Sequence, residues 1–141
     1  MTIQLSQTLR KRLAWMQRVA ALLVILYWVV FWAERDRLPL NAVDLELCFI
    51  LPDLLWIAGS LWMASRWLLL GDLRGRPASA VAGSALVYLG LLDMMINLRH
   101  GQYTNPVSTG LLNAAVNLAC LLFGLWNVYL TVFRCRLGNE E

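Results

Sequence analysis

Three polar residues whose side chains could take part in chemistry interrupt an apolar segment in the second half of the chain. Asp93, Asn97 and His100 follow one another at steps of four and three residues, which places them on one face of an α-helix. An acid inside an apolar helix usually faces the interior of a bundle, where it can carry a proton, bind a cation or act as a general acid or base. The alternative is a hydrogen-bonded network that only fixes helix packing.

A second acid lies in another apolar segment. Asp53 directly follows Pro52, whose missing N–H can bend a helix. Glu46 precedes Asp53 by seven residues, a spacing that keeps both acids near one helical face. The Asp53 carboxyl could hold a ligand, or it could interact with backbone groups that the proline leaves unpaired.

Other kinds of chemistry find little support. A zinc site needs three or four ligands in one place, and the candidates are only His100, Glu46, Asp53 and Asp93. The sole histidine has no serine or cysteine at a short spacing, which argues against a nucleophile and base pair. The three cysteines form no Cys-x-x-Cys motif, and no phosphate loop or nucleic-acid motif is present. We expect no metal, no cofactor and no nucleic-acid partner.

The composition is that of a membrane protein. The chain has 141 residues, of which 60% are hydrophobic and 15% charged, with a mean hydropathy of +0.59, too apolar for an ordinary soluble domain. The net charge is +3, but the basic residues flank apolar segments instead of forming one patch, which is a topology signal. We therefore expect an integral membrane protein.

The predicted fold is all-α, an antiparallel four-helix transmembrane bundle with short loops that forms one domain over residues 1–141. Phe31 stands where a signal cleavage site would need a small residue, so the first apolar segment is interpreted as an uncleaved helix. Asn105 and Pro106 form a helix start signal before the last segment. The expected helices cover about 8–33, 44–70, 78–99 and 106–133.

The distribution of Lys and Arg predicts the orientation. Nine of the twelve flank the side that holds the two termini and the loop at 71–77, and three lie on the other side. The excess of positive charge places both termini in the cytoplasm, and we expect the cell, or inner, membrane.

This topology brings several polar side chains to a similar depth. At 1.5 Å per residue, four of them lie about 10–12 Å from the outer ends of their helices. They are Tyr27, Asp53, Asp93 and Asn113, beneath a polar mouth of Glu46, Asn97 and His100. Two acids in one layer would titrate as a coupled pair, so a shared proton or a bound cation is physically reasonable.

Aromatic and amide side chains are assigned to packing. Tyr27, Trp28 and Trp32 crowd the far end of the first helix, and the seven tryptophans are interpreted as an interfacial belt. The asparagines of the last helix are interpreted as contacts between helices.

The leading hypothesis is a non-enzymatic membrane protein with an outward-facing polar pocket that binds or helps transport a small cation, a proton or an amphipathic ligand. Four helices are few for a transport path, so we expect a homo-oligomer or a larger complex in the bilayer, with Ser79, Gly83 and Gly90 as a contact surface. One alternative is an accessory subunit whose polar stripes only pack. Another is an intramembrane enzyme acting on a lipid, with Asp93 as acid/base and Asp53 positioning it.

Overall fold

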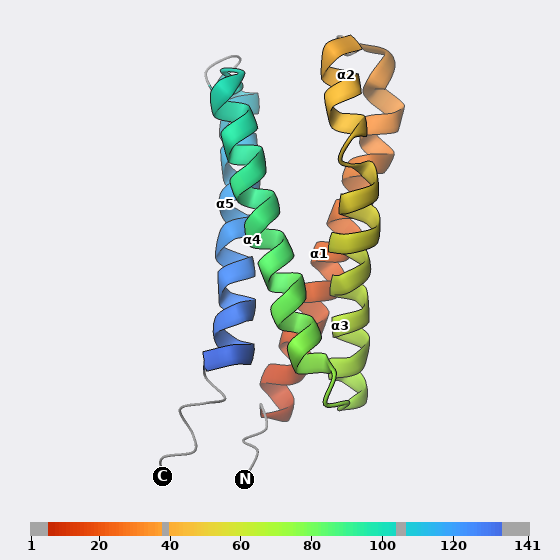
Figure 1. Ribbon diagram of the computed structural model, residues 1–141, viewed down its shortest axis with the longest axis vertical. Coiled ribbons are helices and arrows are strands. Elements are labelled where there is room, and N and C mark those ends of the chain that lie inside the picture. Colours follow the sequence, from red (N-terminus) through yellow and green to blue (C-terminus); the bar gives the residue numbers. More distant parts are fainter. Residues whose placement is uncertain (1–5, 38–39, 104–106, 134–141) are drawn as a thin grey trace. The chain divides into compact units, whose positions relative to one another are not determined.

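The computed structural model describes residues 6–37, 40–103 and 107–133, and the secondary structure in these ranges is helical throughout (Figure 1). Contacts divide the described residues into two compact units, 6–79 and 80–133. Each unit consists of helices packed along one another. The first is built around α1 (Gln7–Glu34) and α3 (Gly59–Leu70), and the second around α4 (Gly75–Arg99) and α5 (Val107–Val128).

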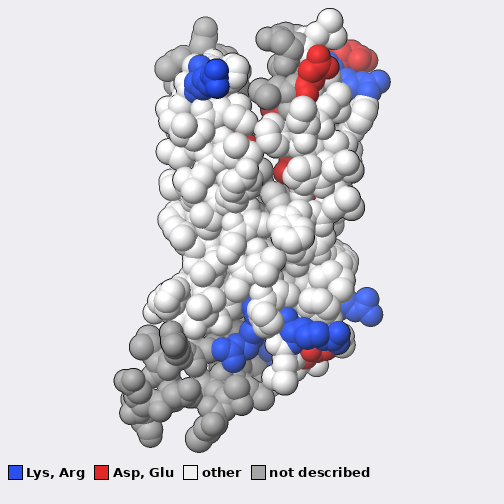
Figure 2. Space-filling view, in the orientation of Figure 1, with Lys and Arg blue, Asp and Glu red and all other residues white. Residues whose placement is uncertain are grey.

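Within the described residues, three helices are long and apolar enough to cross a bilayer, namely Gln7–Arg37, Gly75–Arg99 and Gly110–Phe133. Large apolar side chains along them are exposed, including Leu23 and Val29 at 60%. Over the unit of residues 6–79, most of the charged side chains visible in Figure 2 lie toward the ends of the helices. Exposed apolar surface of this extent is typical of contact with lipid. These features indicate a membrane protein.

Helix α1 (Gln7–Glu34) is the longest element and continues into a 3-10 turn at Arg35–Arg37. The Ser6 side chain accepts a hydrogen bond from the Leu9 N–H and so caps the first turn. The sequence of α1 contains neither glycine nor proline, the two residues that destabilise the interior of a helix. The buried residues recur at helical spacing and form the stripe that packs against the segment at 52–70: Leu13, Ala14, Gln17, Ala21, Trp28 and Phe31.

The segment predicted as one helix over 44–70 is divided. Helix α2 (Leu40–Leu47) ends in a turn at 48–49, and a π-helix, η2 (Pro52–Ala58), leads directly into α3 (Gly59–Leu70). The break has a local cause, because a proline lacks an N–H and its ring clashes with the carbonyl four residues earlier, here that of Cys48. Within η2 the helix is wide, and the Gly59 N–H donates to the Leu54 carbonyl five residues back.

Helix α3 ends at Gly71, whose φ of 73° is in the left-handed region. The N–H of Gly71 donates to the Leu68 carbonyl and that of Asp72 to the Trp67 carbonyl, as in a Schellman motif. A Cβ at position 71 would lie 2.9 Å from Nη1 of Arg10, the end of a flexible side chain that would have to move aside. Arg10 therefore ends beside the negative end of the α3 dipole.

The loop after α3 is held by an ion pair between Asp72 and Arg74, with Oδ2 and Nη2 2.6 Å apart. The hydrogen bonds from the Arg74 side chain and backbone lower the pKa of Asp72 to about 2. Helix α4 (Gly75–Arg99) then begins, and the Ser79 hydroxyl donates to the Gly75 carbonyl within its first turn.

Helix α4 and helix α5 (Val107–Val128) meet through small residues, and a π-helical turn at Tyr129–Phe133 extends α5. A Cβ on Gly83 would lie 2.8 Å from the Gly124 carbonyl oxygen, and one on Gly90 would lie 2.9 Å from the Asn117 carbonyl oxygen. Gly83 and Gly90 thus mediate a contact within the chain. This corrects their interpretation as a free surface for a second copy.

Candidate functional site

A buried acid in η2 is bound to a buried tryptophan in α1. The Trp28 indole N–H donates to Asp53 Oδ2 over 3.1 Å, and the two residues are only 2% and 7% exposed. The other carboxyl oxygen, Oδ1, is buried and has no hydrogen-bond partner within 6–37, 40–103 and 107–133. Asp53 therefore has one satisfied and one unsatisfied oxygen in the part of the chain that the structure describes.

The periodicity of α1 explains why Trp28 faces this acid. Ala21, Trp28 and Phe31 are buried at steps of seven and three residues, so they extend the stripe that packs against η2 and α3. The indole contacts Phe31 edge to face with centroids 5.2 Å apart, and Tyr27 at 5.5 Å. These rings restrict the orientation of the indole and aim its N–H at Asp53.

Two other predicted site residues, Tyr27 and Glu46, are in contact with each other. The Tyr27 hydroxyl donates to Glu46 Oε2 over 2.8 Å, and this contact is exposed. Consecutive aromatic residues of α1, Tyr27 and Trp28, thus each donate to one of two acids seven residues apart. The result is a pair of carboxyls anchored on α1, with Glu46 accessible and Asp53 enclosed.

The electrostatics of the enclosed acid are unusual. Ion pairs among the described residues join Arg35 to Asp36, Arg37 to Glu34 and Arg74 to Asp72, and none of these includes Asp53. An ionised carboxylate away from water is costly unless it is paired. A single hydrogen bond from a neutral indole compensates only weakly for the cost of burying this charge. The Asp53 carboxyl is therefore suited to binding a proton or a cation.

The remaining predicted site residues belong to the unit of residues 80–133. Asp93 and Asn97 are half-buried on α4, His100 is exposed directly after it, and Asn113 is half-buried on α5. The Asn97 carbonyl accepts the Gln102 N–H at the turn after α4. Asp53 belongs to the unit of residues 6–79 and Asp93 to the unit of residues 80–133. Their predicted pairing therefore lies within neither unit and stays a prediction.

Sequence reasoning missed Trp28, which it assigned to the interfacial belt. A signal was present, because Ala14, Ala21 and Trp28 are spaced by seven and continue one stripe. It also missed Tyr103, whose hydroxyl accepts a 2.8 Å hydrogen bond from the amide of Asn117 on α5. That bond is part-buried and ties the turn after α4 to α5.

No protein-family model, curated protein or solved structure that was compared with the chain matches it.

Proposed function

We propose that this chain is a multi-pass membrane protein in which the Asp53 carboxyl binds protons and passes them on across part of the bilayer. The observation that supports this function is the environment of Asp53, with Oδ2 bound to Trp28 and Oδ1 buried without a hydrogen-bond partner in the described residues. Acids placed inside membrane helices commonly serve as proton relays.

A proton fits the site better than a metal ion does. Hard cations take several oxygen ligands, and no group of three His, Cys, Asp or Glu side chains occurs within 6–37, 40–103 and 107–133. A proton needs one carboxyl oxygen only, and it removes the charge whose burial is costly. Glu46, linked to α1 by Tyr27, provides an accessible carboxyl from which protons reach the enclosed one.

The proposal includes a fourth span. The continuous helical stretch over 50–70 covers about 30 Å at 1.5 Å per residue, the thickness of the hydrocarbon core. With this span, the unequal distribution of Lys and Arg puts both termini in the cytoplasm of the cell membrane.

Proton flux into liposomes tests this function. Purified protein is reconstituted into liposomes that contain a pH-sensitive dye. A potassium gradient in the presence of valinomycin supplies a membrane potential that drives protons inward. We expect the wild-type protein to transfer protons faster than empty liposomes, and Asp53→Asn to fall to their rate because the amide cannot bind and release a proton. Asp53→Glu should retain flux with a shifted pH profile. Asp93→Asn tests the second carboxyl in the same way.

The matched control is Asp72→Asn, which removes an acid that is paired with Arg74 outside the long apolar helices and should leave the flux unchanged. Thermal unfolding in detergent establishes that each variant is folded. Flux in Asp53→Asn equal to that of the wild type would overturn the proposal, as would wild-type flux no faster than that of empty liposomes. Unchanged flux in Asp93→Asn, with loss in Asp53→Asn, would show that Asp93 takes no part in proton transfer.

A further inference from the structure

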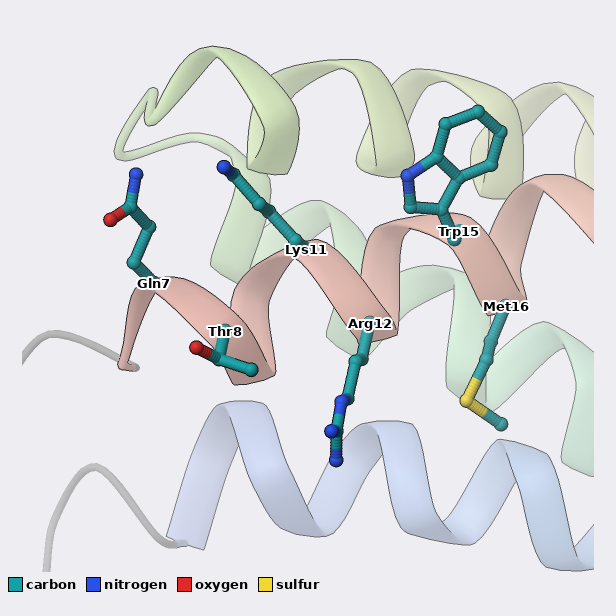
Figure 3. A pocket seen from close by; sticks show the side chains of 6 residues that line it. All are labelled: Gln7, Thr8, Lys11, Arg12, Trp15 and Met16. Carbon is teal, nitrogen blue, oxygen red and sulfur yellow. The ribbon is translucent and has the colours of Figure 1, made fainter.

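The first turns of α1 carry positive charge that is not balanced along the helix. Arg10, Lys11 and Arg12 are consecutive, and no acid follows until Glu34. A hollow of about 480 Å³ lies on this part of α1. Its lining side chains form two rows, visible on the two sides of the helix in Figure 3: Gln7, Lys11 and Trp15 in one row, and Thr8, Arg12 and Met16 in the other.

The three consecutive bases have different roles. Arg10 is directed toward Gly71 at the end of α3, within the contacts of the first unit. Lys11 and Arg12 are exposed and line the hollow, and neither belongs to an ion pair with any described residue. Lys11 and Arg12 are thus exposed to a ligand, whereas Arg10 lies against the end of α3.

The apolar wall of the hollow is held in place from the next turn of α1. Arg18 lies over the Trp15 ring at 5.2 Å and over the Trp62 ring of α3 at 5.4 Å. Its Nε donates to the Ser65 hydroxyl over 2.9 Å. Trp15 remains 58% exposed, so cation–π contacts hold an indole that still faces outward.

The order of side chains along α1 matches the depth profile of a lipid. Lys11 and Trp15 are four residues, or about 6 Å, apart along the axis. Beyond Met16 the helix exposes large apolar side chains, with Val19 at 53% and Leu23 at 60%. A small soluble anion would contact the cations only, whereas a phospholipid would use the cations, the indole and the apolar surface together.

We propose that this hollow binds the headgroup phosphate of an anionic phospholipid, with Lys11 and Arg12 donating to the phosphate and Trp15 packing at the level of the glycerol. The acyl chains then lie along α1 beyond Met16. Charge-assisted hydrogen bonds to phosphate are strong, and arginine matches the phosphate oxygens in two-point contacts. This inference does not depend on proton transfer at Asp53.

Native mass spectrometry of the detergent-solubilised protein tests the site. The protein is titrated with phosphatidylglycerol and, in parallel, with phosphatidylcholine, and binding of the first lipid molecule is measured. We expect the wild type to prefer phosphatidylglycerol. In the double variant Lys11→Gln/Arg12→Gln this preference should fall about 30-fold, because each cation near an anionic headgroup contributes a similar factor to the binding affinity. Swapping the two bases, as in Lys11→Arg/Arg12→Lys, should retain it.

The matched control is Arg35→Gln/Arg37→Gln, which removes two charges at the other end of α1 where Asp36 and Glu34 already pair with them. It should keep the wild-type preference. A double variant Lys11→Gln/Arg12→Gln that still prefers phosphatidylglycerol would overturn the proposal, as would a wild type with no preference. Equal competition by glycerol phosphate and by phosphatidylglycerol would show a soluble-anion site and would also refute it.

Discussion

At the scale of single residues, the hydrogen bond between Trp28 and Asp53 joins a buried tryptophan of α1 to a buried acid of η2. An acid within an apolar run is conspicuous in the sequence, because placing it there costs free energy that a purely structural segment would avoid. A tryptophan is not conspicuous, since indoles are common at the interface for reasons unrelated to any site. Only the packing of α1 against η2 shows that Trp28 is enclosed and that its N–H is directed at the carboxyl.

The hydrogen bond between Trp28 and Asp53 should stabilise the fold measurably. Trp28→Phe removes the donor and leaves the carboxyl with no hydrogen bond from α1, so we expect the free energy of unfolding to fall by about 1–3 kcal/mol. Denaturant titration in detergent micelles measures this change. Trp32→Phe, at a position that is 45% exposed on the same helix, is the control and should have little effect.

Part of the loss in Trp28→Phe comes from the smaller ring, and a double-mutant cycle separates the two causes. In an Asp53→Leu background the acceptor is already gone, so Trp28→Phe should cost less there than in the wild type. An equal cost in both backgrounds would mean that the hydrogen bond contributes nothing to stability.

At the scale of helices, the sequence predicts where apolar segments lie better than how each is divided. Pro52 marks a bend in the predicted helix over 44–70, but the turn at 48–49 precedes the proline, and the π-helical spacing follows it. Both depend on how the backbone adjusts when one N–H is missing. The pattern of small residues on α4 predicts close helix approach, but it does not identify the partner, which proves to be α5.

The contact between α4 and α5 leaves no room for a side chain at Gly83. A Cβ there would lie 2.7 Å from the Asn127 Cβ and 2.8 Å from the Gly124 carbonyl oxygen, so the helices must separate. We expect Gly83→Ala to lower the free energy of unfolding by about 1–3 kcal/mol, the usual effect of overpacking. Thermal unfolding in detergent is the measurement.

The neighbouring Ser84→Ala is the control for Gly83→Ala, because Ser84 is exposed and bonds only to the Ala80 carbonyl of its own helix. It should unfold like the wild type. Wild-type stability in Gly83→Ala would show that α4 and α5 do not pack through this residue in the membrane.

At the scale of the whole molecule, the number of membrane crossings determines which loops lie outside. In the part of the chain that the structure describes, three helices have the length and composition of a span, and the proposed fourth is the stretch over 50–70. With four crossings and a cytoplasmic N-terminus, residue 73 faces the cytoplasm and residue 102 the outside. With three crossings, both positions change sides.

Single cysteines distinguish these topologies. In a background with Cys48, Cys120 and Cys135 replaced by serine, we expect a membrane-impermeant maleimide to label Gln102→Cys in intact cells. Leu73→Cys, at a position that is 75% exposed, should be labelled only after permeabilisation, as should the N-terminal control Ser6→Cys. Labelling of Leu73→Cys but not of Gln102→Cys in intact cells would exclude the fourth crossing.

The meeting of Arg10 with Gly71 constrains which sequence changes the first unit can accept. A residue with a Cβ at position 71 is strained by the φ of 73°, and its Cβ would also displace the Arg10 guanidinium, which comes from a helix more than sixty residues earlier. A shorter side chain at position 10 removes the second effect and leaves the first. The effects of substitutions at positions 10 and 71 on stability should therefore depend on each other, although the two positions lie at opposite ends of the sequence that forms the hairpin.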